Sequence, residues 1–170
     1  MNLRRIAVPC ALAVALGLAS TAEAKLPTPA VTTIVPGVSV AGVKLGMKTA
    51  AAKKLWGPGS VCGPAATGPG GTQCTWSVTP NAQPDLSPKL TIVLIKGKVR
   101  VITVDGGTGG PAIKAFRTAK KIGVGSTQAA LEKAYPGIST ETNGLGSGPT
   151  VTYFSTKNGR VQSIQVGSPF

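Results

Sequence analysis

The amino-acid sequence predicts an α+β fold in which two tandem repeats, each a short helix followed by an antiparallel hairpin, form one antiparallel sheet with the helices packed on it. Two observations lead to this prediction. A stretch of glycine and apolar residues that precedes a short helix occurs twice, from Val43 and again from Ile122. Each helix is followed by β-branched segments that flank a turn, Lys96-Gly97-Lys98 in the first repeat and Lys157-Asn158-Gly159 in the second.

Residues 1–24 have the three parts of a secretory signal peptide. A basic start is followed by an apolar run from Ile6 to Ala19 and by the A-x-A site Ala22-Glu23-Ala24. The run has about 14 residues, which is too short to span a bilayer as a helix. Cys10 lies within it and is expected to be lost with it. We therefore expect a protein that is secreted or held in the cell envelope and has no transmembrane segment after cleavage.

Residues 25–37 contain Pro27, Pro29 and Pro36, and we expect an extended linker there. The first repeat is predicted over residues 38–105. A strand edge or an extended approach over residues 38–45 leads to a helix of good helix formers over residues 50–55, with Lys48 or Thr49 near its cap. Its apolar stripe consists of Ala51, Ala52, Leu55 and Trp56.

Cys62 and Cys74 are the only cysteines that follow the signal peptide. An even number of cysteines in an oxidising compartment predicts a disulfide, which would close a loop rich in glycine and proline. Closing a loop of this size stabilises a protein by about 3 kcal/mol in the chain-entropy model. The alternative, a reactive thiol pair, would be expected to have C-x-x-C spacing. A half-buried strand from Cys74 and a hairpin over residues 90–104 complete the repeat.

Residues 106–121 are predicted as a joint between the repeats, which is glycine-rich at its start and forms either a short helix or an irregular lead-in over residues 112–121. The second repeat spans residues 122–170. Its helix is expected from Thr127 to Tyr135, capped by Ser126 or Thr127, and its hairpin over residues 151–166. The segment 123–127 is interpreted as a tight turn and helix cap. The alternative is that its backbone amides bind an anion, although it matches no nucleotide-binding motif.

The composition restricts the possible functions. The chain has 18 lysine and arginine residues, 5 aspartate and glutamate residues, and no histidine. Histidine is the commonest general base and metal ligand. The acids after the signal peptide form no motif; they are Asp85, Asp105, Glu132 and Glu141. We therefore predict that the protein is not an enzyme and has no metal or cofactor. A hydrolase that uses a serine and a lysine is the catalytic alternative.

The segment 43–48, the helix that ends at Leu55-Trp56-Gly57, and the cysteine pair beyond it together resemble one repeat of the secreted β-lactamase inhibitor proteins. The wider group with this pattern includes the small SmpA/OmlA (BamE-like) envelope lipoproteins. The resemblance implies a helix packed on an antiparallel sheet. In the inhibitor family it also implies two such units in tandem, which present a concave sheet to a protein partner. It assigns no contact residues in this chain, because no Asp or Phe stands in a matching motif.

The leading functional hypothesis is a non-enzymatic module that binds an extracellular or envelope protein through an exposed sheet face. Aromatic residues carry much of the energy at protein interfaces, so the candidate contacts are Trp76, Tyr153 and Phe154. The alternative for these three residues is ordinary packing in the core.

The second hypothesis is electrostatic binding of an anionic wall polymer or of lipid head groups. Its candidate residues lie near the first helix and on the first hairpin: Lys44, Lys48, Lys53, Lys54, Lys96, Lys98 and Arg100. A further basic group precedes the second helix: Lys114, Arg117, Lys120 and Lys121. Few aromatic residues alternate with these basic residues, so specific nucleic-acid binding is not expected. The simpler interpretation is that the charge only keeps the protein soluble.

Overall fold

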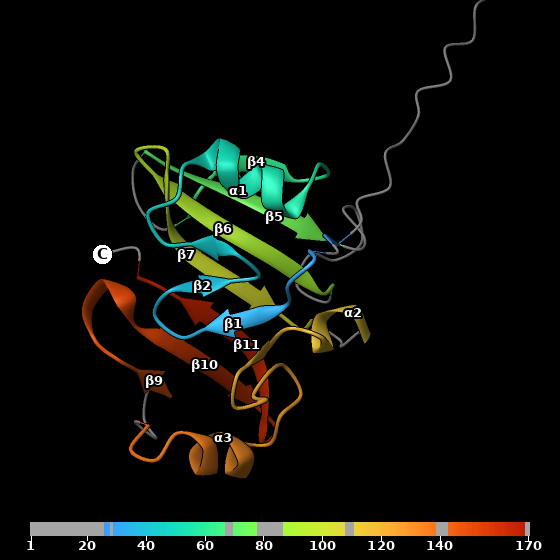
Figure 1. Ribbon diagram of the computed structural model, residues 1–170, viewed down its shortest axis with the longest axis vertical. Coiled ribbons are helices and arrows are strands. Elements are labelled where there is room, and N and C mark those ends of the chain that lie inside the picture. The colour runs from blue at the N-terminus through green and yellow to red at the C-terminus, as the bar shows by residue number, and fades with distance from the viewer. Residues whose placement is uncertain are drawn as a thin grey trace, which may run out of the picture.

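The computed structural model describes residues 26–27, 29–66, 70–77, 87–107, 111–138 and 143–168. The predicted signal peptide, Asp85 and Glu141 lie outside these ranges. Two β-sheets and several short helices make up the described part of the chain (Figure 1).

The larger sheet has seven antiparallel strands in the order β4-β5-β6-β7-β11-β10-β9. These strands are β4 (Val61–Pro64), β5 (Gly71–Ser77), β6 (Lys89–Ile95), β7 (Lys98–Asp105), β9 (Gly144–Leu145), β10 (Thr152–Lys157) and β11 (Arg160–Val166). The smaller sheet has four strands in the order β3-β2-β1-β8, and its β1–β8 pair is parallel. Its strands are β1 (Thr33–Val35), β2 (Ser39–Val40), β3 (Val43–Lys44) and β8 (Arg117–Thr118).

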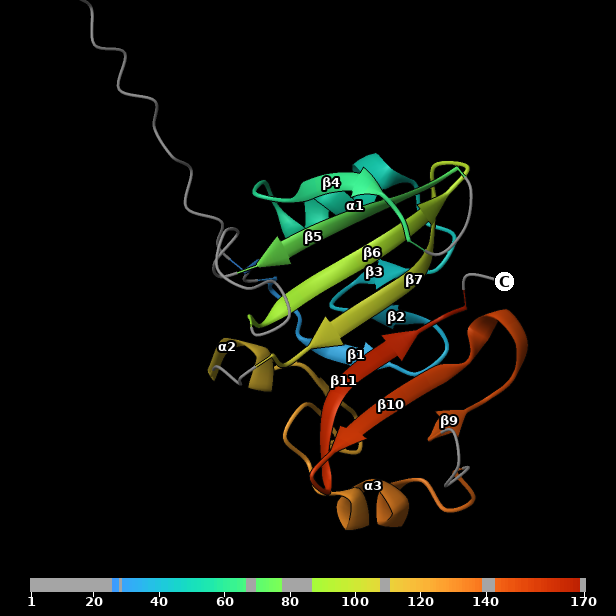
Figure 2. The ribbon, with the colours of Figure 1, turned by 180° about the vertical axis from the view of Figure 1, so that it is seen from behind.

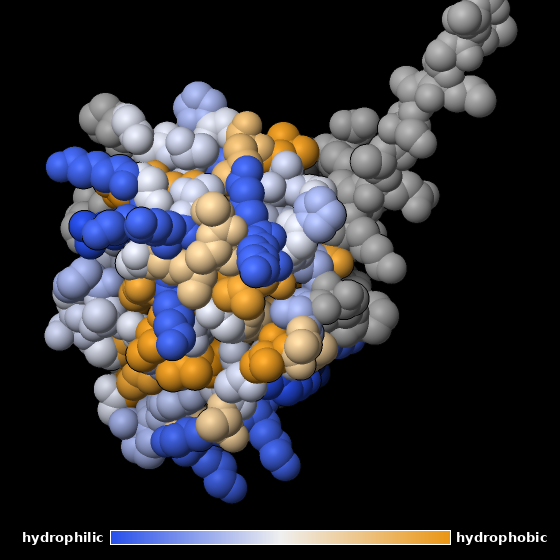
Figure 3. Space-filling model, turned by 45° about the horizontal axis from the view of Figure 1, so that its top comes forward, coloured by the Kyte–Doolittle hydropathy of each residue, from blue (hydrophilic) through white to orange (hydrophobic). Residues whose placement is uncertain are grey.

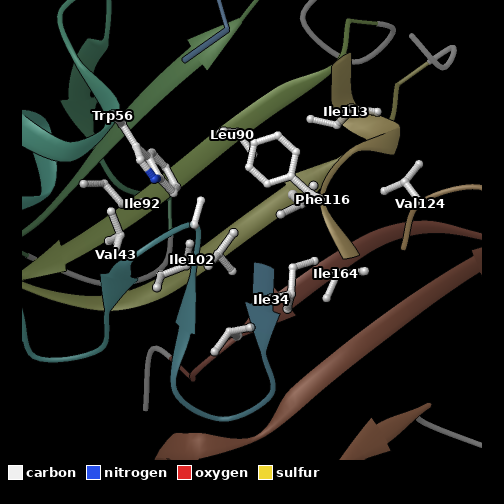
Figure 4. Close-up of a cluster of buried hydrophobic side chains, with 14 of the residues drawn as sticks. Ile34, Val43, Trp56, Leu90, Ile92, Ile102, Ile113, Phe116, Val124 and Ile164 are labelled. Carbon is white, nitrogen blue, oxygen red and sulfur yellow. The ribbon is translucent and has the colours of Figure 1, made fainter. Parts of the chain in front are cut away.

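The smaller sheet and helix α1 (Thr49–Trp56) cover one face of the larger sheet, and no described element covers the other face (Figures 1 and 2). The remaining helices are α2 (Pro111–Lys114), α3 (Gln128–Ala134) and the 3-10 helix η1 (Gly148–Thr150). The hydrophobic core fills the space between the two sheets, where Ile34 and Val43 of the smaller sheet meet Ile92 and Ile102 of the larger one (Figure 4).

Alternation along the strands sorts the side chains of the larger sheet between its two faces. Across the sheet, one row of paired residues faces the core, and all of them are fully buried: Trp76, Leu90, Val104, Ile164 and Phe154. The adjacent row points to the opposite face: Thr75, Thr91, Thr103, Gln165 and Tyr153. We call the second surface the outer face.

The two predicted hairpins are confirmed as β6–β7 and β10–β11. Both turns have two consecutive residues with positive φ, Lys96 at 51° and Gly97 at 70°, and Asn158 at 52° and Gly159 at 69°. This conformation is typical of a type I′ turn, whose twist matches that of the flanking strands. Helix α3 also begins as predicted, because the Thr127 side chain accepts a hydrogen bond of 3.1 Å from the amide of Ala130.

The predicted α+β fold of two helix-and-hairpin repeats with a single sheet is wrong. The chain is mostly β, with a seven-stranded antiparallel sheet and a separate four-stranded mixed sheet. The prediction failed because several short segments were interpreted as linker, loop or joint. Segments as short as these form strands only when a partner strand from elsewhere in the chain supplies the hydrogen bonds.

Three of these segments illustrate the correction. The expected linker over residues 25–37 contains β1, in which Ile34 is only 1% exposed. The expected joint over residues 106–121 contains α2 and β8, and it buries Ile113 and Phe116. The expected loop between the cysteines is instead largely the β4–β5 hairpin, and the predicted Cys62–Cys74 disulfide joins directly paired residues of these two strands.

The approaches to α1 and α3 contact the following hairpins through corresponding hydrogen bonds. The amide of Gly46 donates to Val99 O (2.7 Å), and that of Gly125 donates to Val161 O (2.8 Å). The amide of Thr49 likewise donates to Gly97 O, and that of Gln128 to Gly159 O. The correspondence is confined to these short segments, since the strands around them differ in number and partner.

Candidate functional site

Two of the three aromatic residues predicted to contact a partner are buried in the core. Trp76 and Phe154 are both 0% exposed and belong to the row that faces the smaller sheet. The register of the strands places them there, because neighbouring residues of a strand point to opposite faces. Neither side chain can contact a partner in this fold, so this part of the prediction is wrong.

Tyr153 lies on the outer face and is 38% exposed. The residues between Tyr153 and β4 on its row are uncharged and polar, and the hydroxyls of Thr75 and Thr91 are 3.3 Å apart. On the next row the Lys89 ammonium pairs with the Asp105 carboxylate at 3.6 Å. The outer face is thus nearly neutral, although the chain is strongly basic. It also carries apolar side chains, because Val61 pairs with Thr75 and is 66% exposed, and Val93 and Val101 lie on the row of Gln73.

The seven basic residues predicted to bind polyanions are all exposed, and we call them the α1 cluster: Lys44, Lys48, Lys53, Lys54, Lys96, Lys98 and Arg100. The fold brings them together because the segment before α1 runs beside the β6–β7 turn. Lys48 and Lys98 form an isolated bridge, and the Thr49 side chain donates to Gly97 O at 3.1 Å. Long hydrophilic side chains surround hydrophobic surface on this side of the molecule (Figure 3).

A second group of basic residues surrounds two adjoining pockets at the other end of the molecule. The pockets have volumes of about 560 and 680 Å³ and share three lining residues, Arg117, Gly125 and Arg160. We call their basic residues the pocket cluster: Lys114, Arg117, Lys120, Lys121, Lys133, Lys157 and Arg160. No aspartate or glutamate lines either pocket. All seven residues are exposed, so the pockets are open to solvent.

Backbone carbonyl groups hold the two shared arginines in place. Arg117 donates from Nε to Lys114 O (3.1 Å) and from Nη1 to Lys121 O (2.8 Å). Arg160 donates from Nη1 to Gly125 O (3.0 Å). Lys120 is held differently, because its Nζ donates to Ala134 O and lies 4.7 Å from the centre of the Tyr135 ring.

A glycine opposite Arg117 makes room for this arrangement. Gly123 forms a bridge with Arg117, and a Cβ at Gly123 would overlap Phe116 O and lie 2.9 Å from Arg117 Cγ. Position 123 therefore has to be glycine for the arginine stem to pack across it.

Sequence reasoning identified part of the pocket cluster and missed the rest. The basic run before the second helix was visible, but nothing associated it with Lys157 and Arg160, which lie beside the second hairpin turn. The isolated bridge between Thr127 and Arg160 brings the two regions together. The available signal was the correspondence of Gly97 with Gly159, which places Arg160 in the position of Lys98.

The two acidic residues in the described part of the chain, Asp105 and Glu132, do not pair with each other. The Asp105 carboxylate pairs with Lys89 and accepts a hydrogen bond from the amide of Gly107 (3.0 Å). Glu132 accepts one from the side chain of Gln128 (2.9 Å). In the same part of the chain, no group of three or more histidine, cysteine, aspartate or glutamate residues could hold a metal ion. None of the helices that the structure describes is long and apolar enough to cross a membrane.

The Cys62–Cys74 disulfide is typical of proteins in an oxidising compartment. Comparison of the chain with known protein families, with curated proteins and with solved structures finds no match.

Proposed function

We propose that this protein is a secreted, non-enzymatic binding protein that holds an anionic polymer of the cell envelope through its basic surface. The observation that carries the proposal is the arrangement of charge. Two exposed clusters of lysine and arginine lie at opposite ends of the molecule, and no carboxylate lines the pockets of one of them. Like charges brought together in this way repel one another, and an anionic ligand would relieve that repulsion.

The separation of the clusters favours an extended ligand over a compact one. The α1 cluster is an open surface, while the pocket cluster surrounds depressions, and a polymer could contact both in succession. Each contact between exposed charges contributes little by itself, typically about 0.2–1 kcal/mol. Affinity would therefore come from many contacts and from release of the counterions that surround the polymer, which makes binding fall steeply as salt is added.

Retention on immobilised polymer tests this proposal. The chain from Lys25 onward is passed over poly(glycerol phosphate) or linear polyphosphate, and over dextran as an uncharged control, at about 0.05 M and then about 0.5 M salt. We expect retention on both anionic polymers at low salt and release at high salt. Absence of retention at low salt, or retention that salt does not change, would overturn the proposal.

A matched pair of variants tests whether the α1 cluster takes part. Replacing Lys48, Lys53 and Lys54 together by glutamine should weaken polymer binding about tenfold at low salt, because three cationic contacts are removed. Replacing the same residues by arginine keeps the charge and should leave binding nearly unchanged. Equal behaviour of the two triple variants would exclude a contribution from this part of the cluster.

A protein partner on the outer face is the second candidate function. One observation favours it: this face is nearly neutral, is uncovered by any described element, and presents Tyr153 at 38% exposure. A complex formed there should persist at about 0.5 M salt, since buried contacts are screened less than exposed charges. The change Tyr153→Ala should weaken it, whereas Ser155→Ala on the same strand should not. Because the sequence resembles β-lactamase inhibitor proteins, a β-lactamase belongs among the proteins tested.

A further inference from the structure

We propose that the paired pockets around Arg117 and Arg160 form a binding site for a phosphate group. This inference rests on the proposed function, because it names the group of the polymer that the site would recognise. The two arginines line both pockets, so a phosphate between them could accept hydrogen bonds from both guanidinium groups. The planar fork of N–H groups on arginine matches phosphate oxygens in pairs, which a lysine ammonium cannot do.

The two arginines keep donors for a ligand after their structural contacts are made. A guanidinium has five N–H groups. Within the described residues, Arg117 uses two N–H groups for the carbonyls of Lys114 and Lys121, and Arg160 uses one for the carbonyl of Gly125. These contacts also hold the side chains in one conformation, so less conformational entropy is lost when a ligand binds.

The charge around the arginines suits a multiply charged anion. One pocket adds Lys114 and Lys157, and the other adds Lys120, Lys121 and Lys133. The nearest acid in sequence to the first pocket, Asp105, pairs with Lys89, which lines neither pocket. A phosphate with up to two negative charges and several acceptor oxygens would satisfy more of these cations than a single carboxylate.

The glycines of the first pocket leave space for the ligand but do not themselves bind it. Gly106, Gly107 and Gly125 line the pocket without side chains. Their amides are already used: Gly106 N donates to Gln162 O (2.9 Å), Gly107 N to the Asp105 side chain, and Gly125 N to Val161 O (2.8 Å). Recognition would therefore depend on the basic side chains and not on a cradle of backbone amides, so substitutions of those side chains are a direct test.

The test measures binding of inorganic phosphate and of glycerol phosphate to the chain from Lys25 onward by calorimetry at low salt, with acetate as the comparison anion. We expect both phosphates to bind more tightly than acetate. Arg160→Gln should weaken phosphate binding by about tenfold or more, because paired charge-assisted hydrogen bonds are lost. Arg100→Gln, which removes the same charge from the α1 cluster, should change it less than about twofold.

A second variant separates recognition from folding, because Arg117 and Arg160 also hold the backbone. In the described part of the chain the ammonium groups of Lys114 and Lys157 make no hydrogen bond, so the double variant Lys114→Gln/Lys157→Gln is expected to fold normally. It should still weaken phosphate binding several-fold. The proposal of a phosphate site would be overturned if neither this double variant nor Arg160→Gln weakened phosphate binding more than Arg100→Gln does.

The outcomes separate the site from the proposed function. If the polymer still retains the Arg160→Gln variant and the protein does not bind phosphate, the proposed phosphate site is overturned but the proposed polymer binding is not. Phosphate binding that depends on Arg160, without polymer retention, would support the site and overturn the proposed function. Vesicles of phosphatidylglycerol, compared with phosphatidylcholine, identify the source of the phosphate. If phosphatidylglycerol vesicles bind the protein and inorganic phosphate prevents this binding, the phosphate belongs to a lipid head group. If only poly(glycerol phosphate) binds the protein, the phosphate belongs to a wall polymer.

Discussion

The rings of Trp56 and Trp76 meet edge to face, with their centroids 5.0 Å apart and their planes at 82°. This contact joins the C-terminal end of α1 to β5, and aromatic pairs in such geometry contribute about 0.5–1.5 kcal/mol beyond their buried area. The two indoles differ in hydrogen bonding. Trp76 Nε1 donates to Gly57 O at 3.1 Å, whereas the buried Trp56 Nε1 has no partner among the described residues.

Replacement of each tryptophan by phenylalanine should therefore have unequal effects. Trp76→Phe removes a hydrogen bond and leaves Gly57 O without its donor, which should lower the free energy of unfolding by about 2–4 kcal/mol. Trp56→Phe loses volume but also removes an unpaired polar group, so we expect a loss smaller by about 1 kcal/mol. Urea unfolding followed by circular dichroism measures both. A larger loss for Trp56→Phe would contradict this interpretation of the pair.

The Cys62–Cys74 disulfide should stabilise the β4–β5 edge without affecting anion binding. It joins paired residues of two adjacent strands, with a sequence separation of 12. Replacing both cysteines by serine should lower the free energy of unfolding by about 2–4 kcal/mol. Phosphate binding measured below the unfolding transition should stay unchanged, since β4 and α3 lie at opposite ends of the molecule (Figure 2). A concurrent loss of phosphate binding would show that the two ends are coupled.

Substitutions at the N-cap positions of α1 and α3 should have opposite effects on stability. Thr127 caps α3 with its side chain, so Thr127→Ala should destabilise the protein by about 1 kcal/mol. Lys48 occupies the N-cap of α1 and makes no capping hydrogen bond. Lys48→Asp should therefore stabilise the protein by up to about 1 kcal/mol, through a cap and a favourable interaction with the helix dipole. Thermal unfolding of both variants, with Lys53→Asp as the control within the same helix, measures the difference.

Gly123→Ala should disturb Arg117 and hence phosphate binding. A Cβ at this position would overlap Phe116 O and crowd the Arg117 stem, and a forced shift of this kind costs about 1–3 kcal/mol. Gly63→Ala is a suitable control, because a Cβ there meets nothing within 4 Å and Gly63 has no positive φ. We expect weaker phosphate binding only for Gly123→Ala, measured by calorimetry on folded protein. Unchanged binding would mean that the position of Arg117 does not depend on this glycine.

The features predicted correctly from the sequence are those that depend on neighbouring residues. The turns Lys96-Gly97 and Asn158-Gly159, the Thr127 cap and the pairing of Cys62 with Cys74 were all visible in the sequence. A type I′ turn requires positive φ at two successive residues, and a cap requires a short polar side chain within one helical turn of the amides. Such signals lie within a few residues of one another, so a sequence displays them directly.

The fold class and the placement of the site residues depended on partners distant in sequence. Residues 33–35 form a strand only because β2 and β8 pair with them. Trp76 and Phe154 face the core, and Tyr153 faces outward, because of the strand register, in which a shift of one residue exchanges the two faces.

The sequence by itself determined the excess of positive charge, the disulfide, the hairpins and the start of α3. The tertiary structure alone decided which strands are neighbours, which aromatic residues are buried, and that Arg117 and Arg160 line the same pockets. The physical reason is the range of the interactions. Turn and cap preferences act within a few residues, whereas strand pairing and burial depend on which distant segments supply hydrogen bonds and apolar surface.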